Sequence, residues 1–167
     1  MSGRRIVLMA FAIFALAGCT NMKSGGGEEA GAGKKISTAD VPAPVMRALN
    51  DRFPGNTVTS VEKETENGNV VYDFELKMNA RKYESDIKED GTIMEIEKQV
   101  MNVPASITES VKAKYPNAKI GDVMEVNRVK GKTETPDHYE VTMTDRGKEK
   151  EVNVSLDGKT VSTEAAE

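Results

Sequence analysis

The chain has 167 residues, a formal net charge of −4 at pH 7, one histidine and one cysteine. A single cysteine excludes an intrachain disulfide and any metal site built from several cysteines. An acidic chain has no electrostatic basis for binding nucleic acid or anionic lipid directly, so we expect no nucleic acid among its partners.

The first 18 residues have the organisation of a bacterial export signal. Arg4 and Arg5 form a charged start, and residues 6–16 form an apolar core. This core is shorter than the ~20 apolar residues that span a bilayer, and small residues follow it. We therefore predict a cleaved signal peptide over residues 1–18 rather than a membrane-spanning helix.

The residues at the predicted cleavage point carry a second signal. Leu-Ala-Gly-Cys at residues 16–19 resembles the lipobox of bacterial lipoproteins. This resemblance implies that Cys19 becomes the first residue of the mature chain, carries palmitate and further acyl chains, and anchors the protein in a membrane. Thr20 in place of Asp resembles the pattern sent to the outer membrane, which implies a lipid-anchored protein facing the periplasm or the cell surface. The alternative is an ordinary secreted protein in which Cys19 is incidental.

Residues 19–39 read as a lipidated tether. Two glycine-rich stretches, at residues 24–27 and 30–33, dominate this segment. Glycine-rich chain has few side chains that bury surface and behaves as flexible coil. We therefore predict a spacer between the lipid anchor and the folded part of the chain.

One pattern occurs twice in the remaining sequence. Val-Pro-Ala starts at Val41 and again at Val103, and an aromatic-proline pair starts at Phe53 and again at Tyr115, in both cases 62 residues apart. Self-similarity of this kind indicates two copies of one structural unit.

The spacing changes farther along the two copies. Asp-Gly pairs start at Asp90 and at Asp157, which are 67 residues apart. The second copy has therefore gained five residues, most simply around residues 131–136. We predict a first repeat over residues 40–100 and a second over residues 101–167.

Each repeat begins with a pattern typical of a short amphipathic helix. Apolar residues recur at positions i, i+4 and i+8, which lie on one face of a helix. Each helix is expected to end before a proline, which disfavours helix at the preceding residue. The two apolar faces consist of Val45, Leu49 and Phe53 in the first repeat and Ile107, Val111 and Tyr115 in the second.

After each helix the apolar period changes to two, as in an antiparallel sheet with one buried and one wet face. The side chains expected to be most buried are Leu49, Phe53, Tyr72, Phe74, Val111, Tyr115, Tyr139 and Val141. One helix on one half-apolar sheet is a two-layer unit. The predicted fold class is α+β, with two tandem helix-plus-four-stranded antiparallel sheet units. One continuous sheet shared by both units is the alternative, because about 60 residues is near the lower limit for a separate core.

These motifs resemble those of the PepSY-like, β-lactamase-inhibitor-like group of bacterial periplasmic proteins. The resemblance covers residues 40–163 as two copies, and its motifs are structural: prolines, glycines and core aromatics. It implies a PepSY-like fold and a protein that binds or restrains a secreted enzyme, peptidases especially. A β-lactamase-inhibitor protein of similar architecture uses its open sheet face for binding.

The sequence offers little for catalysis or metal binding, so we expect neither an enzyme nor a cofactor. His138 is the only histidine, and no Gly-x-Ser-x-Gly motif accompanies it. Carboxylates alternate along predicted strands, as at Glu62 and Glu64 and at Glu95 and Glu97. Such rows are able to hold a divalent cation, but the lysines between them favour a solvated surface of mixed charge.

The same alternation assigns the sheet face that the helices leave open, and we expect a partner there. Tyr72, Tyr83 and Tyr139 fall on the inward side, so this face lacks the aromatic anchors of tight interfaces. Polar contacts that weaken in salt are therefore expected. The predicted face consists of Asp73, Glu75, Lys77, Lys82, Glu84, Asp86, Glu140, Thr142, Glu151 and Asn153.

The functional prediction follows from the export signal, the resemblance and this face. We expect a membrane-anchored, non-catalytic cell-envelope lipoprotein that binds a secreted enzyme such as a peptidase, a peptide or an envelope protein. The alternative is a structural or stress-type envelope protein without a discrete ligand.

Overall fold

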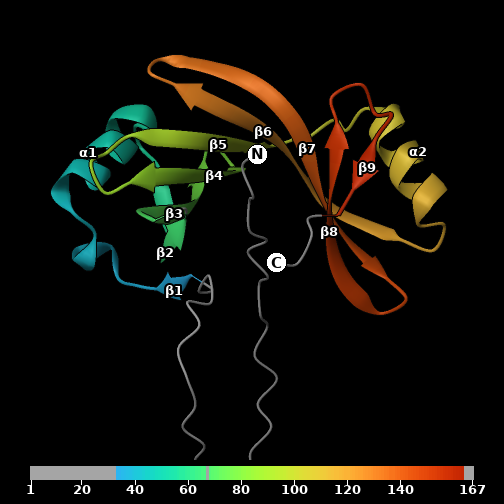
Figure 1. Ribbon diagram of the computed structural model, residues 1–167, viewed down its shortest axis with the longest axis horizontal. Coiled ribbons are helices and arrows are strands. Elements are labelled where there is room, and N and C mark those ends of the chain that lie inside the picture. Colours follow the sequence, from blue (N-terminus) through green and yellow to red (C-terminus); the bar gives the residue numbers. More distant parts are fainter. Residues whose placement is uncertain (1–32, 67, 164–167) are drawn as a thin grey trace, which may run out of the picture.

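The computed structural model describes residues 33–66 and 68–163 (Figure 1). The predicted signal peptide, Cys19 and most of the predicted tether lie outside these residues. The prediction that the tether extends to residue 39 is wrong, because residues 34–35 pair with the sheet and residues 38–40 form a 3-10 helix. The helices are α1 (Ala43–Arg52) and α2 (Ala105–Lys114), and a 3-10 helix, η1 (Thr38–Asp40), precedes α1. The strands are β1 (Lys34–Lys35), β2 (Thr57–Glu66), β3 (Asn69–Met78), β4 (Arg81–Lys88), β5 (Ile93–Gln99), β6 (Lys119–Lys130), β7 (Thr133–Asp145), β8 (Lys148–Ser155) and β9 (Val161–Ser162).

All strands of the described residues belong to one nine-stranded antiparallel sheet, in which the spatial order equals the chain order. The prediction of two helix-plus-four-stranded units, each with its own sheet, is therefore wrong. β5, the last strand of the first repeat, pairs with β6, the first strand of the second, and places Glu97 opposite Val126. This pairing satisfies backbone N–H and C=O groups that two separate sheets would leave exposed at their edges.

The five additional residues of the second repeat were predicted around residues 131–136, and this segment forms the end of the β6–β7 hairpin. β6 and β7 contain 12 and 13 residues, whereas β2 and β3 contain 10 each. Figure 1 shows the longer hairpin extending from the second repeat over the first. There Glu134 forms ion pairs with Arg52 of α1 and Lys98 of β5.

Each helix packs on the sheet through the apolar face that the spacing predicted, so each repeat has its own core. The first core contains Val41, Val45, Leu49, Phe53, Val61, Tyr72, Phe74, Leu76, Ile87 and Ile96. The second contains Ile107, Val111, Val123, Val141, Met143, Val152 and Val154. Six of the eight side chains expected to be most buried are buried. Tyr115 and Tyr139 are half-buried instead, because they pack at the margin of the second core.

The Asp-Gly turns contact the helices directly. Gly91 has a φ of 90°, and a Cβ atom there would lie 2.9 Å from the carbonyl oxygen of Pro44 in α1. Gly158 has a φ of 71°, and its Cβ would lie 3.0 Å from the Cβ of Ser106 in α2. Only glycine fits both the backbone conformation and the space. The repeated motif therefore positions the first turn of each helix against the sheet as well as reversing the chain.

The sheet is bent into an arch, and the two helices lie on its outer side at opposite ends (Figure 1). Residues that alternate with the core therefore face the inner side of the arch. In the part of the chain that the structure describes, neither helix is long and apolar enough to cross a bilayer.

Candidate partner-binding face

The residues predicted to form a partner face all lie on the inner side of the arch, which we call the inner surface. The register pairs Asp73 with Asp86, Glu75 with Glu84, Lys77 with Lys82, Glu140 with Asn153 and Thr142 with Glu151. Because β5 pairs with β6, these residues from both repeats share one continuous surface.

Four carboxylates are in register across four neighbouring strands of the inner surface. Glu62 on β2 lies opposite Asp73 on β3, Asp73 lies opposite Asp86 on β4, and Asp86 lies opposite Glu95 on β5. We call these four residues the acidic row. Neighbouring strands lie about 4.8 Å apart, and like charges directly opposite each other destabilise a sheet. Arg128 on β6 follows at the end of the row and forms an ion pair with Glu95 at 2.8 Å.

Asp73 lies inside the row and is only 7% exposed. Its side chain makes no hydrogen bond and no ion pair with any residue that the structure describes. Burial, followed by the charges of Asp86 and Glu84, raises the pKa of Asp73 well above its ordinary value. A buried carboxylate that lacks a donor or a cation is unfavourable when ionised. The row therefore contains a recessed acid that nothing in the described chain compensates.

A second set of carboxylates runs beside the acidic row, with Glu84 opposite both Glu75 on β3 and Glu97 on β5. Burial raises the pKa of Glu84 to about 7, against the effect of Lys82 and with contributions from Glu75 and Glu140. Glu140 lies on β7, three strands from β4 in the sheet. The arch therefore brings carboxylates of the two repeats within electrostatic range of each other.

Lys82 lies on the inner surface, and its ammonium group is bound by a carboxylate of the second repeat. Its ammonium group donates to Asp122 at 3.1 Å, and the amide of Gln99 donates to the other oxygen of Asp122 at 3.2 Å. Although burial opposes it, the hydrogen bond to Asp122 and the charge of that carboxylate raise the pKa of Lys82. The ion pair of Lys82 is therefore with Asp122 and not with a member of the acidic row.

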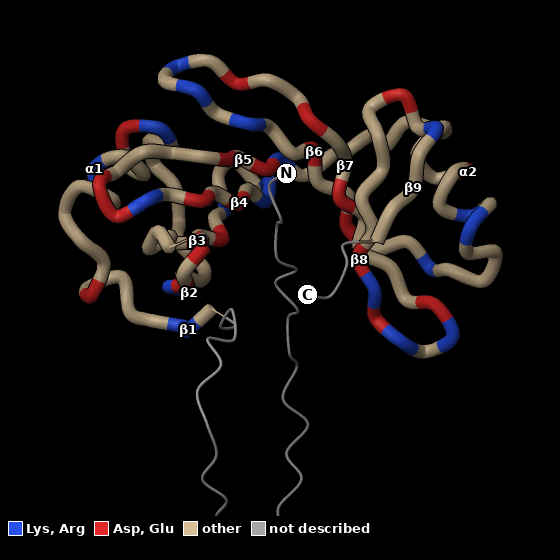
Figure 2. Tube along the Cα trace, viewed as in Figure 1, with Lys and Arg blue, Asp and Glu red and all other residues tan. Residues whose placement is uncertain are grey.

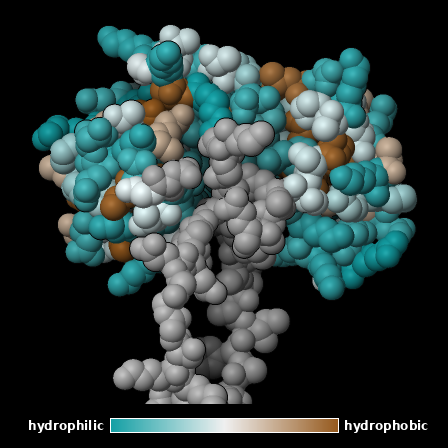
Figure 3. Space-filling view, viewed as in Figure 1, coloured by the Kyte–Doolittle hydropathy of each residue, from teal (hydrophilic) through white to brown (hydrophobic). Residues whose placement is uncertain are grey.

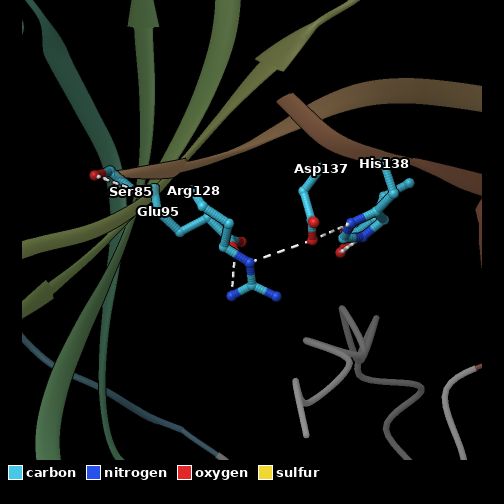
Figure 4. Close-up of polar contacts among 6 residues, drawn as sticks. Ser85, Glu95, Arg128, Asp137 and His138 are labelled. Atoms are coloured by element: carbon cyan, nitrogen blue, oxygen red, sulfur yellow. Dashed lines mark hydrogen bonds and ion pairs between the residues drawn. The ribbon is translucent and has the colours of Figure 1, made fainter. Parts of the chain in front are cut away.

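A chain of polar contacts crosses the inner surface between the repeats (Figure 4). Arg128 contacts Glu95 through Nη1, and its Nε donates to Asp137 at 3.3 Å. His138 Nδ1 lies 3.1 Å from the same Asp137 oxygen, and His138 Nε2 lies 3.5 Å from Glu140. Burial acts to raise the pKa of Asp137, but the hydrogen bond with His138 and the Arg128 guanidinium lower it overall. The single histidine of the sequence is therefore part of a charged network.

The aromatic side chains lie where the alternation predicted. Tyr72 and Tyr83 belong to the first core, and Tyr139 packs against the second. Met124 and Val126 on β6 are buried on the inner surface.

Figure 2 shows acidic residues on β3 in the first repeat and on β7 and β8 in the second, and Figure 3 shows a mainly hydrophilic exterior in this view. The inner surface is therefore dominated by carboxylates.

The carboxylates do not form a metal centre on their own. Within residues 33–66 and 68–163, no three His, Cys, Asp or Glu side chains are arranged to hold a metal ion.

Two family models match different parts of this chain. Residues 27–95 match the PepSY-like family, which is described as beta-lactamase-inhibitor-like. Residues 105–166 match a protein family of unknown function, DUF3889. The predicted PepSY-like resemblance is therefore confirmed over residues 27–95. A search of curated proteins found no match.

Solved structures with similar folds come from Bacteroides species. A protein of Bacteroides eggerthii DSM 20697 described as periplasmic has a TM-score of 0.52 and 15% identity, covering 74% of this chain and 88% of that one. A DUF2874 family protein of Bacteroides ovatus ATCC 8483 has a TM-score of 0.52 and 12% identity, covering 74% and 89%. Another, from Bacteroides uniformis ATCC 8492, has a TM-score of 0.50 and 18% identity, covering 73% and 88%. At these identities the likeness establishes the fold.

Sequence reasoning missed part of this surface. It recognised that Glu62 and Glu95 belong to alternating carboxylate rows, but it interpreted them as solvated charges of separate strands. It did not assign Arg128 or Val126 to the inner surface. The alternation was visible in the sequence, whereas the register that lines up the carboxylates of four strands was not.

Proposed function

We propose that this protein is a lipid-anchored, non-catalytic binding module of the bacterial cell envelope. In this proposal it engages another protein or a peptide through the inner surface of the arched sheet. The observation that carries the proposal is continuity: pairing of β5 with β6 makes one surface from two repeats, and both helices lie on the opposite side. A surface of this kind offers a partner contacts from both repeats at once.

The similarity to known proteins supports a binding module of the cell envelope. The family that matches residues 27–95 is described as beta-lactamase-inhibitor-like, and the Bacteroides eggerthii structure is described as a periplasmic protein. Binding to a secreted enzyme, such as a peptidase, is consistent with both descriptions.

The lipid anchor is a separate part of the proposal and rests on the lipobox-like residues 16–19. Cleavage before Cys19 leaves a mature chain that starts with the acylated cysteine and continues through a tether that ends before β1. Mass spectrometry of the mature N-terminus should find acylated Cys19, and Cys19→Ala should release the protein from membranes. A free thiol at Cys19, or membrane retention of the variant, contradicts the anchor and leaves the inner surface unaffected.

Photo-crosslinking in the native envelope tests the binding function. A crosslinking amino acid replaces Lys77 or Thr142, which are exposed on the inner surface of the first and second repeats. The matched control replaces Lys112, which is exposed on α2 outside the arch. We expect one dominant crosslinked protein from both inner positions and none from Lys112. Absence of a crosslink from the inner positions favours a structural envelope protein without a discrete ligand.

A further inference from the structure

We infer that the inner surface binds a cationic segment of a partner protein, rich in lysine or arginine, one of whose basic side chains reaches Asp73 in the acidic row. This inference rests on the proposed function and specifies the chemistry of the partner.

The first observation is the arrangement of the acidic row itself. Three cross-strand pairs in succession join acid to acid: Glu62 with Asp73, Asp73 with Asp86, and Asp86 with Glu95. Each such pair is unfavourable for an isolated sheet. Bases flank the row at both ends, since Lys35 on β1 lies opposite Glu62 and Arg128 contacts Glu95. Within the row, both cross-strand neighbours of Asp73 are acids. A positive charge from outside the chain, placed beside Asp73, would therefore stabilise the sheet.

The second observation is the burial of Asp73 and its lack of a partner. Asp73 is recessed, only 7% exposed, and has no hydrogen-bond or ion-pair partner among the described residues. Lysine and arginine carry their charge at the end of a long apolar stem, so they reach a recessed carboxylate while their backbone stays at the rim. Asp73 is therefore a receptor for the terminal group of such a side chain.

The geometry favours a basic segment over a divalent cation. A calcium ion needs six to eight oxygen atoms at about 2.3–2.6 Å from one point. The acidic row spreads its carboxylates over four strands, each about 4.8 Å from the next. No group of three potential ligands is arranged for a metal in the part of the chain that the structure describes. A linear array of carboxylates matches several cationic side chains of one extended segment.

The protonation of the surface agrees with this geometry. Burial and neighbouring carboxylates raise the pKa of Asp73, and burial raises the pKa of Glu84 to about 7. Without a bound cation, Asp73 and Glu84 therefore stay protonated at pH values at which the same carboxyl groups of an unfolded chain are ionised. A cationic segment displaces these protons, so its affinity should rise as the pH increases through 7.

The test is a binding titration of the mature lipoprotein in detergent with oligolysine, and with oligoglutamate as the reference peptide. We expect oligolysine to bind and oligoglutamate not to bind, and the affinity for oligolysine to fall at high salt because exposed charges are screened. Asp73→Asn should weaken oligolysine binding by about tenfold or more. The matched control, Glu109→Gln, removes one acidic charge from an exposed position on α2, outside the arch. It should leave the affinity for oligolysine within about twofold of wild type, because it does not lie on the inner surface.

Folding of each variant is checked by its unfolding transition, and Glu62→Gln on the same row replaces Asp73→Asn if that variant does not fold. Equal weakening by the row variant and by Glu109→Gln overturns the inference, as does equal binding of oligoglutamate. Calcium binding that competes with oligolysine and is lost in Asp73→Asn also overturns it and assigns the row to a metal. A crosslink at Thr142 that is unchanged in Asp73→Asn rejects the cationic partner while the binding function stands. Oligolysine binding without any envelope crosslink rejects the proposed function instead.

Discussion

Arg52, the last residue of α1, forms an ion pair with Glu134 on β7. Glu134 lies in the segment that only the second repeat contains, and it also forms an ion pair with Lys98 on β5. The five-residue difference between the repeats thus has a structural role. It lengthens a hairpin of the second repeat until a carboxylate at its end lies between two basic residues of the first.

The first prediction concerns this contact between the repeats. Glu134→Gln should lower the free energy of unfolding by about 1 kcal/mol, a modest value because Arg52 is well exposed and its ion pair is screened by solvent. The measurement is urea denaturation at low and high salt, and the loss should shrink at high salt. Glu149→Gln is the control with the same change of charge. An equal loss in both variants would mean that the contact with Arg52 and Lys98 contributes nothing specific.

The second prediction concerns the repeated Asp-Gly turn. Gly91→Ala and Gly147→Ala both place a side chain at positive φ, since these glycines have φ values of 90° and 78°. Only the Cβ at Gly91 meets another atom, the Pro44 carbonyl oxygen, whereas nothing lies within 4 Å of a Cβ at Gly147. Gly91→Ala should therefore cost about 1–3 kcal/mol more than Gly147→Ala, from overpacking against α1. Thermal unfolding of the two variants checks this, and equal midpoints would contradict the close approach.

The third prediction separates the two aromatic residues that end the helices. Phe53 is 3% exposed, and its ring centroid lies 5.7 Å from that of Tyr83. Phe53→Ala should cost about 3–5 kcal/mol, because it leaves a cavity in the first core. Tyr115 is half-buried and carries the ammonium groups of Lys114 and Lys150 near its ring, at 5.8 and 5.0 Å from the centroid.

Tyr115→Ala should therefore cost less, about 1–2 kcal/mol, since part of the ring remains in water. Urea denaturation of both variants compares the two losses directly. A larger loss at Tyr115 than at Phe53 would show that the second core depends on its marginal aromatic residue.

The fourth prediction concerns pH. The pKa of Glu84 is raised from 4.5 to about 7, so the folded chain binds more protons than the unfolded chain between these values. The free energy of unfolding should therefore fall as the pH rises through this window, and Asp73 acts in the same direction. Glu84→Gln removes one titrating group, so it should reduce this slope and stabilise the protein above pH 7.

Urea denaturation at a series of pH values from about 4.5 to 8 tests this prediction over the window in which Glu84 titrates. Glu149→Gln is the matched control, because it removes one carboxylate from an exposed position. A Glu84→Gln variant with the same slope as wild type would show that Glu84 titrates normally in the folded protein.

Much of the architecture could be predicted because its signals are local. The spacing of Val45, Leu49 and Phe53 defines one face of a helix whichever sheet it covers, and α1 buries this face. Alternation along a strand decides which side chains share a face, because successive residues of a strand point to opposite sides. For this reason the predicted partner residues, from Asp73 to Asn153, all lie on the inner surface.

The repeat, the helix faces and the side of each strand are encoded locally in the sequence. The pairing of β5 with β6 is not, and neither is the register that aligns Glu62, Asp73, Asp86 and Glu95; both depend on how the strands assemble in three dimensions. Register depends on backbone hydrogen bonds between residues far apart in the chain and on irregularities such as the shift between Asp86 and Ile87. No local period encodes these features, because a slip along one strand leaves its alternation unchanged while it changes every residue opposite.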